Sequence, residues 1–98
     1  MRVGEKIREL RESKGLVLRK LAMALDIDTA TMSKIEKGYR QARPNHITLL
    51  AEYLETDETE LRIHWIADKL IQILDENGVN AIKSLRKAEE MIEKRNAS

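Results

Sequence analysis

The stretch "LAMALDIDTATMSKIEKG", residues 21–38, predicts two short amphipathic helices with only about three residues between them. Leu18, Leu21, Ala22 and Leu25 recur at the spacing of one helical face, which predicts a first helix of about eight residues. Asp28 is a favourable N-cap for a second helix over residues 29–37, and Gly38 is a favourable stop. The stretch therefore predicts two closely crossing helices joined by a tight turn.

The second of these helices has an outward face of small polar and basic residues. At 100° per residue this face spans about 140°, opposite the apolar side chains that must pack against the first helix. The outward face consists of Thr29, Ala30, Ser33, Lys34 and Lys37. A tight turn holds such a helix as a ridge, and the major groove of B-DNA, about 12 Å wide, admits one α-helix. Lysines on an exposed helix are also common as plain solvated charge, so this pattern alone leaves both interpretations open.

The rest of the chain is helical in pattern as well, with one proline, four glycines and no alternating run that predicts a strand. A helix is expected from Val3 to the glycine at position 15, and another from Pro44. Asp57 and Glu60 form a capping box that opens a long helix to about Asn77, and a last helix follows over roughly 80–94. We expect an all-α fold in which a domain at residues 1–56 and a helical extension at 57–98 form one compact unit.

The long helix carries more apolar surface than one packing face requires. Its isoleucines and leucines from position 63 onward cover about 160° of the helical wheel, and Leu61 and Trp65 project from the opposite side. A helix that is apolar on two sides needs two partners. One is the N-terminal bundle, and the other is either the last helix of the chain or a second chain, of which we favour the second chain. The residues predicted for a dimer interface are Leu61, Trp65, Ile66, Ile73, Leu85 and Ile92.

Composition restricts the class of protein. The chain of 98 residues is 42% hydrophobic and 36% charged, which is typical of a globular domain. It has no cysteine and no apolar run of membrane-spanning or signal-peptide length, so we expect a cytoplasmic protein without membrane association. Residues 1–43 carry eleven Lys and Arg against six Asp and Glu, a net of +5, whereas residues 44–98 carry seven against eleven, a net of −4. The basic half is the one suited to a polyanion.

Taken together, "KIRELRESKGL", "LRKLAMALDID" and "TATMSKIEKG" resemble the phage Cro/repressor (XRE-type) helix-turn-helix family over residues 4–55. The resemblance implies a five-helix, lambda-repressor-like bundle that binds DNA sequence-specifically as a homodimer. It also implies that the helix at 29–37 is the recognition helix. The small family members that the chain resembles are phage repressors and the controller proteins of restriction–modification systems.

Site residues follow from this resemblance by position. Base edges would be met by Thr29, Ala30, Ser33 and Lys34, because methyl groups suit thymine and lysine suits guanine. Phosphates would be met by Lys37, Tyr39, Arg40 and Arg43 after the recognition helix, and by Arg11 and Arg19 from the first two helices. Arg11 also matches a family position that pairs with Glu36 and braces the recognition helix.

Three positions depart from the family pattern. Val17 stands where a capping Ser, Thr or Asn is usual, and Leu18 stands where a phosphate-contacting Gln is usual. Asp26 occupies the turn position that is usually Gly, which Asp tolerates because it adopts left-handed backbone more readily than most residues. These departures leave the phosphate contact of the second helix to Arg19.

The sequence shows no pattern typical of an enzyme or of a metal, cofactor or small-molecule site. His46 and His64 stand apart from any acidic or cysteine residues at ligand spacing. We therefore expect a transcriptional regulator that binds a palindromic operator in double-stranded DNA as a homodimer. Two alternatives stay open: an antitoxin that represses its own operon and binds a toxin, and a helix-turn-helix adaptor that binds proteins instead of DNA.

Overall fold

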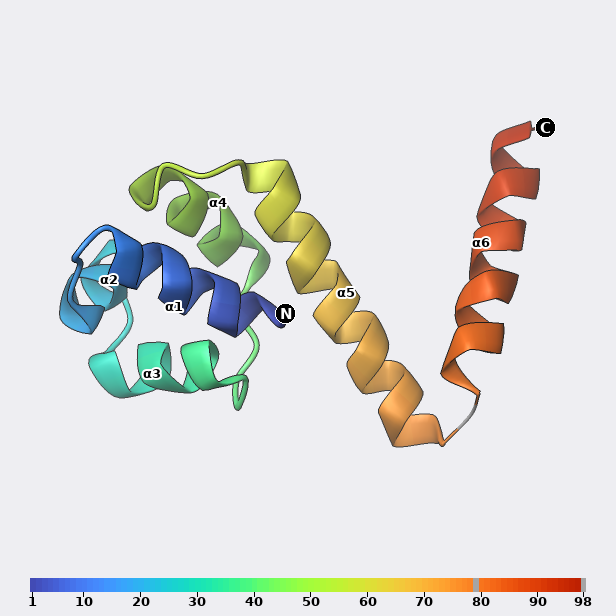
Figure 1. Ribbon diagram of the computed structural model, residues 1–98, viewed down its shortest axis with the longest axis horizontal. Helices are drawn as coiled ribbons and strands as arrows, with labels where there is room; N and C mark the ends of the chain where they lie inside the picture. The colour runs from blue at the N-terminus through green and yellow to red at the C-terminus, as the bar shows by residue number, and fades with distance from the viewer. Residues whose placement is uncertain (79, 98) are drawn as a thin grey trace. The chain divides into compact units, whose positions relative to one another are not determined.

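The computed structural model describes residues 1–78 and 80–97, and within them all regular structure is helical (Figure 1). Six helices follow one another: α1 (Val3–Ser13), α2 (Leu18–Ala24), α3 (Thr29–Lys37), α4 (Pro44–Tyr53), α5 (Glu58–Asn77) and α6 (Ala81–Ala97). The chain divides into two compact units, Met1–Ile66 and Ala67–Ser98, and α5 belongs to both. The all-helical fold predicted from the sequence is confirmed.

The ends of α3 form as their residues dictate. The Asp28 carboxylate accepts a hydrogen bond from the Thr31 backbone N–H at 2.7 Å, and Gly38 ends the helix in left-handed conformation with a φ of 81°. The turn before α3 places Asp26 at a φ of 56°, the conformation expected where the family has Gly. Val17 precedes α2 without a side-chain cap. The helix-turn-helix of residues 18–37 therefore lies where the sequence predicts it.

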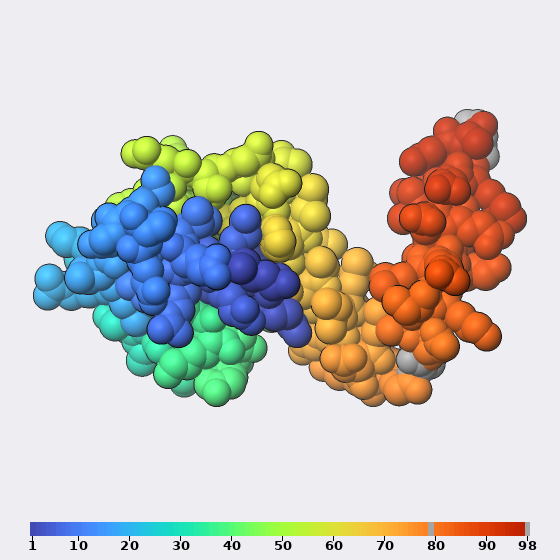
Figure 2. Space-filling view, viewed as in Figure 1, coloured from blue at the N-terminus to red at the C-terminus, as the bar shows by residue number. Residues whose placement is uncertain are grey.

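The core of the first unit is built from the apolar faces of α1 to α4 and the first turns of α5. Its members are all at most 7% exposed: Val3, Ile7, Leu21, Ala22, Leu25, Met32, Ile35, Ala42, Ile47, Leu50, Ala51, Leu54, Leu61 and Trp65. Within this core α1 packs on α3, and α2 packs on both α3 and α4. The side chains of α1 and α3 meet along one side of the unit (Figure 2). Burial from five helices fixes the orientation of α3.

Gly4 lets α1 approach the backbone of α3 directly. A Cβ built on Gly4 would lie 2.5 Å from the carbonyl oxygen of Ile35 and still closer to that of Glu36. Cβ atoms essentially never lie so close to a backbone oxygen, so any other residue would push the two helices apart. The start of α1 therefore packs directly on the last turn of α3.

The structure corrects the prediction for two of the proposed interface residues. Leu61 is fully buried and Trp65 is only 4% exposed, both in the core of the first unit, so neither is available to a second chain. The side of α5 that the sequence assigned to a partner is the side that covers the bundle. The broad apolar arc lies on the other side, where Ile63, Ile66, Leu70 and Ile73 are exposed.

The second unit contains the end of α5 and all of α6, and no described residue of α6 is buried. Ile73 is 56% exposed, Leu85 37% and Ile92 47%, and each lies on the apolar side of its helix. Most of the stability of a protein helix comes from packing of its apolar face, so α6 is expected to need a partner for its apolar side. None of the helices described is both long enough and apolar enough to cross a lipid bilayer.

Candidate nucleic-acid interface

The face of α3 predicted to read DNA is accessible. Thr29, Ala30, Lys34 and Lys37 are exposed, whereas Met32 and Ile35 on the opposite side are buried in the core. Both lysines lie toward the C-terminal end of the helix, where positive charge interacts favourably with the helix dipole. This face combines hydroxyl, methyl and ammonium groups, which are the groups that contact base edges in the major groove.

A bidentate ion pair holds α3 against α1. Arg11 Nε donates to Glu36 Oε2 at 2.8 Å, and Arg11 Nη2 donates to Glu36 Oε1 at 3.1 Å. Arg11 Nη1 donates to the carbonyl oxygen of Leu16 at 2.9 Å, which ties in the start of the helix-turn-helix as well. The two side chains are 14% and 6% exposed. The predicted brace is present, and it occupies all three nitrogens of the guanidinium.

Ser33 is less accessible than the other predicted base-contacting residues. It is half-buried and lines a surface cavity of about 510 Å³ beside the ion pair of Arg11 and Glu36, together with Lys37 and Tyr39. Tyr39 is 80% exposed, so its ring extends into solvent from the turn after α3. The groups from Ser33 to Tyr39 therefore lie along one edge of α3 and the turn after it, whereas Thr29 and Ala30 lie at the start of α3.

The loop after α3 presents alternating exposed and buried residues. Arg40, Gln41 and Arg43 are exposed, whereas Ala42 between them is only 4% exposed. The Ala42 carbonyl oxygen accepts a hydrogen bond from the Trp65 indole Nε1 at 2.9 Å in the buried core. The loop is thus anchored at its one inward residue and directs its arginines to solvent.

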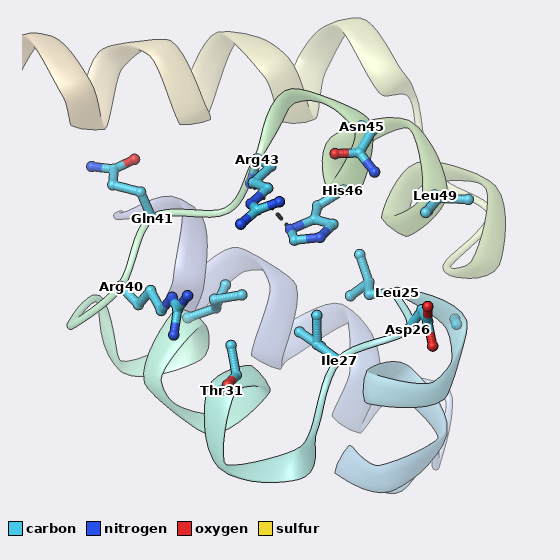
Figure 3. Close-up of a pocket in the computed structure, with 12 residues that line it drawn as sticks. Leu25, Asp26, Ile27, Thr31, Arg40, Gln41, Arg43, Asn45, His46 and Leu49 are labelled. Carbon is cyan, nitrogen blue, oxygen red and sulfur yellow. Dashed lines mark hydrogen bonds between the residues drawn. The ribbon is translucent and has the colours of Figure 1, made fainter.

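A second cavity, of about 450 Å³, lies between this loop, the turn before α3 and the start of α4 (Figure 3). Arg40, Arg43 and His46 line it together with Thr31. The Nδ1 atom of His46 accepts a hydrogen bond from the Arg43 backbone N–H at 3.1 Å, drawn as the dashed line in Figure 3. Because Nδ1 is an acceptor, the neutral imidazole carries its proton on Nε2.

Electrostatics at the two ends of this region follow from these contacts. Burial lowers the pKa of His46, and the positive charges of Arg43 and Arg40 lower it further. Hydrogen bonds from Thr31 lower the pKa of the Asp28 carboxyl, with smaller contributions from Lys34 and Arg40. A neutral histidine and an ionised N-cap are therefore the states that the fold favours.

Four contacts that position this surface were not predicted from the sequence: Gly4 against α3, Trp65 on Ala42, His46 on Arg43, and Arg62 on Pro44 and Thr48. Only the first leaves a sequence signal, because an isolated glycine inside an amphipathic helix often marks a close backbone approach. The other contacts are hydrogen bonds between residues 3 to 23 positions apart in the chain, and the periodicity of apolar residues does not predict such pairs. Arg19, predicted for phosphate contact, is exposed on the first turn of α2.

Comparison with known proteins bears on this geometry. A family model described as "Helix-turn-helix domain" matches residues 2–63, which is more than half of the chain. The chain belongs to the helix-turn-helix domain family. The matched residues of this helix-turn-helix protein include α1 to α4 and the first residues of α5, as far as Ile63.

A solved structure gives a fold-level match. The crystal structure of the clp gene regulator ClgR from C. glutamicum is similar to the helix-turn-helix protein with a TM-score of 0.56 at 23% sequence identity. The match covers 66% of this chain and 84% of ClgR. No curated protein matches the chain. The helix-turn-helix fold is therefore supported both by the family model and by a solved structure.

Membership of the family supports DNA binding in the regulation of transcription. Among the residues that the structure describes, no three His, Cys, Asp or Glu side chains gather where they could hold a metal ion. The groups that the helix-turn-helix protein offers at this surface are cations, hydroxyls and backbone, which suit a nucleic acid.

Proposed function

We propose that this protein is a sequence-specific transcriptional regulator of the Cro/repressor type that binds a palindromic operator in double-stranded DNA as a homodimer. The observation that carries the proposal is the exposed face of α3, held from behind by Gly4 and by the pair of Arg11 and Glu36. A recognition helix must keep its angle to the body, because base contacts depend on positions within fractions of an ångström.

Roles divide between the helix and the loop that follows it. Thr29, Ala30, Ser33 and Lys34 would contact base edges, and Lys34 is the one suited to guanine O6 and N7. Phosphates would be contacted by cationic and phenolic groups at the margins of that helix: Arg19, Lys37, Tyr39, Arg40 and Arg43. For Arg11 we favour the brace, since each of its guanidinium nitrogens already donates to a protein oxygen.

The homodimer follows from the exposed apolar sides of α5 and α6. We assign the interface to Ile66, Ile73, Leu85 and Ile92, which are between 37% and 56% exposed. Two copies would set their recognition helices about 34 Å apart, which matches half-sites one turn of DNA apart. The same exposed surface is what an antitoxin would offer to a toxin, so a stable monomer in isolation would favour that alternative.

The experiment compares two single variants. Lys34→Ala is expected to reduce discrimination at one base position by about 1–3 kcal/mol and to leave other positions unchanged. Arg43→Ala is expected to weaken binding to all sequences alike and to lower the salt slope by about 0.9. Lys83→Ala, which removes a lysine charge from α6, serves as the control and should change neither quantity.

Binding is measured by titration of a selected operator and a mixed-sequence duplex at several salt concentrations. If Lys34→Ala and Arg43→Ala behave identically on both duplexes, the division between base and phosphate contacts is wrong. If the wild type shows no salt-dependent binding to either duplex, the proposal fails and the alternative of a protein-binding adaptor is favoured.

A further inference from the structure

The contacts around the loop after α3 converge on a single peptide group. The Ala42 carbonyl and the Arg43 N–H belong to the same planar unit, because they lie on either side of one peptide bond. Trp65 Nε1 donates to that carbonyl at 2.9 Å, and His46 Nδ1 accepts from that N–H at 3.1 Å. Both polar ends of the peptide group are thus held by side chains, one from α5 and one from α4.

The next residue is held from α5 as well. Arg62, one turn before Trp65, donates from Nη2 to the Pro44 carbonyl oxygen at 3.3 Å, and its guanidinium carbon lies 5.8 Å from the centre of the Trp65 ring. Arg43 therefore stands between two carbonyls that both bond to α5, while its own side chain is exposed. Hydrogen bonds at both ends of a planar group oppose its rotation, and this restricts the direction in which the Cα–Cβ bond of Arg43 leaves the loop.

We propose that Trp65 is a positioning residue for DNA binding, which acts by fixing the Ala42–Arg43 peptide group so that Arg43 is directed at a backbone phosphate. This inference rests on the proposed function, because Arg43 is assigned there to a phosphate. The ring of Trp65 packs in the core, and its indole N–H also donates a hydrogen bond to Ala42 that a ring without a donor cannot make.

The test uses the full chain and four variants: Trp65→Phe, Arg43→Ala, the double variant of these two, and Leu61→Val. Trp65→Phe keeps an aromatic ring in the core and removes the donor to Ala42. Leu61→Val is the matched control, since it loosens a fully buried residue of the same helix without touching the loop. All are compared at a temperature at which each is folded.

The first measurement is the salt dependence of binding to a duplex. Arg43→Ala should lower the slope by about 0.9, the value for one phosphate contact. Trp65→Phe should lower the slope in the same direction, and the double variant should fall no further than Arg43→Ala alone, because both changes remove one contact. Leu61→Val should keep the wild-type slope even where it lowers thermal stability. An unchanged slope in Trp65→Phe, or additive losses in the double variant, would overturn the proposal.

The second measurement needs no DNA. Hydrogen exchange of the Arg43 amide, followed by NMR, should be faster in Trp65→Phe by roughly two- to tenfold, the range to which the net contribution of one hydrogen bond converts. The same amide in Leu61→Val should exchange at the wild-type rate after correction for global stability. A wild type that fails to bind DNA would sink the proposed function, and the exchange rates would still decide whether Trp65 holds this peptide group.

Discussion

Replacing Arg11 by methionine tests how α3 is held in place. Arg11→Met keeps an unbranched stem but removes both charge-assisted hydrogen bonds to Glu36, at 2.8 and 3.1 Å. The Glu36 side chain is only 6% exposed, so its carboxylate would be left buried without a partner. Such a loss costs about 3–5 kcal/mol in a closed core. Since Arg11 retains 14% exposure and water reaches one end of the pair, we expect about 3 kcal/mol.

The assay is urea unfolding followed by far-ultraviolet circular dichroism, with the midpoint and slope fitted separately. In thermal unfolding, a loss of this size should lower the melting temperature by roughly 12–24 °C in a domain of under 100 residues. Glu36→Leu and the double variant complete a mutant cycle. The double variant should be more stable than the sum of the single losses predicts, with a coupling of about 2 kcal/mol or more. Single losses below about 1 kcal/mol that add in the double variant would refute the reasoning.

Three further predictions concern α1, α4 and the extension. Gly4→Ala should destabilise the fold by roughly 1–3 kcal/mol and weaken operator binding, because the alanine methyl group would meet the backbone of α3 rather than a movable side chain. A variant as stable as the wild type in thermal unfolding would contradict the close packing. Burial lowers the folded-state pKa of His46 below its ordinary value of 6.5, so its contribution to the free energy of unfolding is fully present above that pH and is lost as the pH falls below it. The variant His46→Gln cannot titrate at this position, so its stability should depend less on pH between about pH 5 and 7 when both proteins are unfolded with urea. Two superimposable stability profiles would exclude the effect. Ile73→Lys should weaken self-association more than tenfold in analytical ultracentrifugation, because an interface would bury the new charge unpaired. The control variant Gln72→Lys on the same helix should leave the dissociation constant of the dimer unchanged. Equal effects of the two substitutions would place the interface elsewhere.

Local signals in the sequence were sufficient for the helix-turn-helix. Asp28 and Gly38 define the ends of α3 through interactions with their own chain neighbours, and the apolar spacing within α2 and α3 identifies the sides that pack together. The pair of Arg11 and Glu36 was available only through resemblance, since 25 residues separate its members. The outward face of α3 follows from its inward face, which is why its exposed residues could be predicted.

Helix α5 shows where such signals stop. A helical wheel reports that two sides are apolar, but not which side covers the bundle. The structure shows that Leu61 and Trp65 do so, and that the loop before α4 provides the buried carbonyl oxygen of Ala42, which accepts a hydrogen bond from Trp65. That requirement is tertiary and has no counterpart in periodicity. The wider arc of isoleucines was the stronger pattern, and it lies on the exposed side.

The chain contains a single tryptophan, and that residue is Trp65. Its indole is buried, donates its N–H to the loop carbonyl next to Arg43, and has the Arg62 guanidinium 5.8 Å from its ring centre, so its emission spectrum responds to changes in these surroundings. Selective excitation of this one residue therefore reports on the environment of the loop with no label attached. Stopped-flow mixing of the unmodified protein with duplex can follow the loop's response in real time.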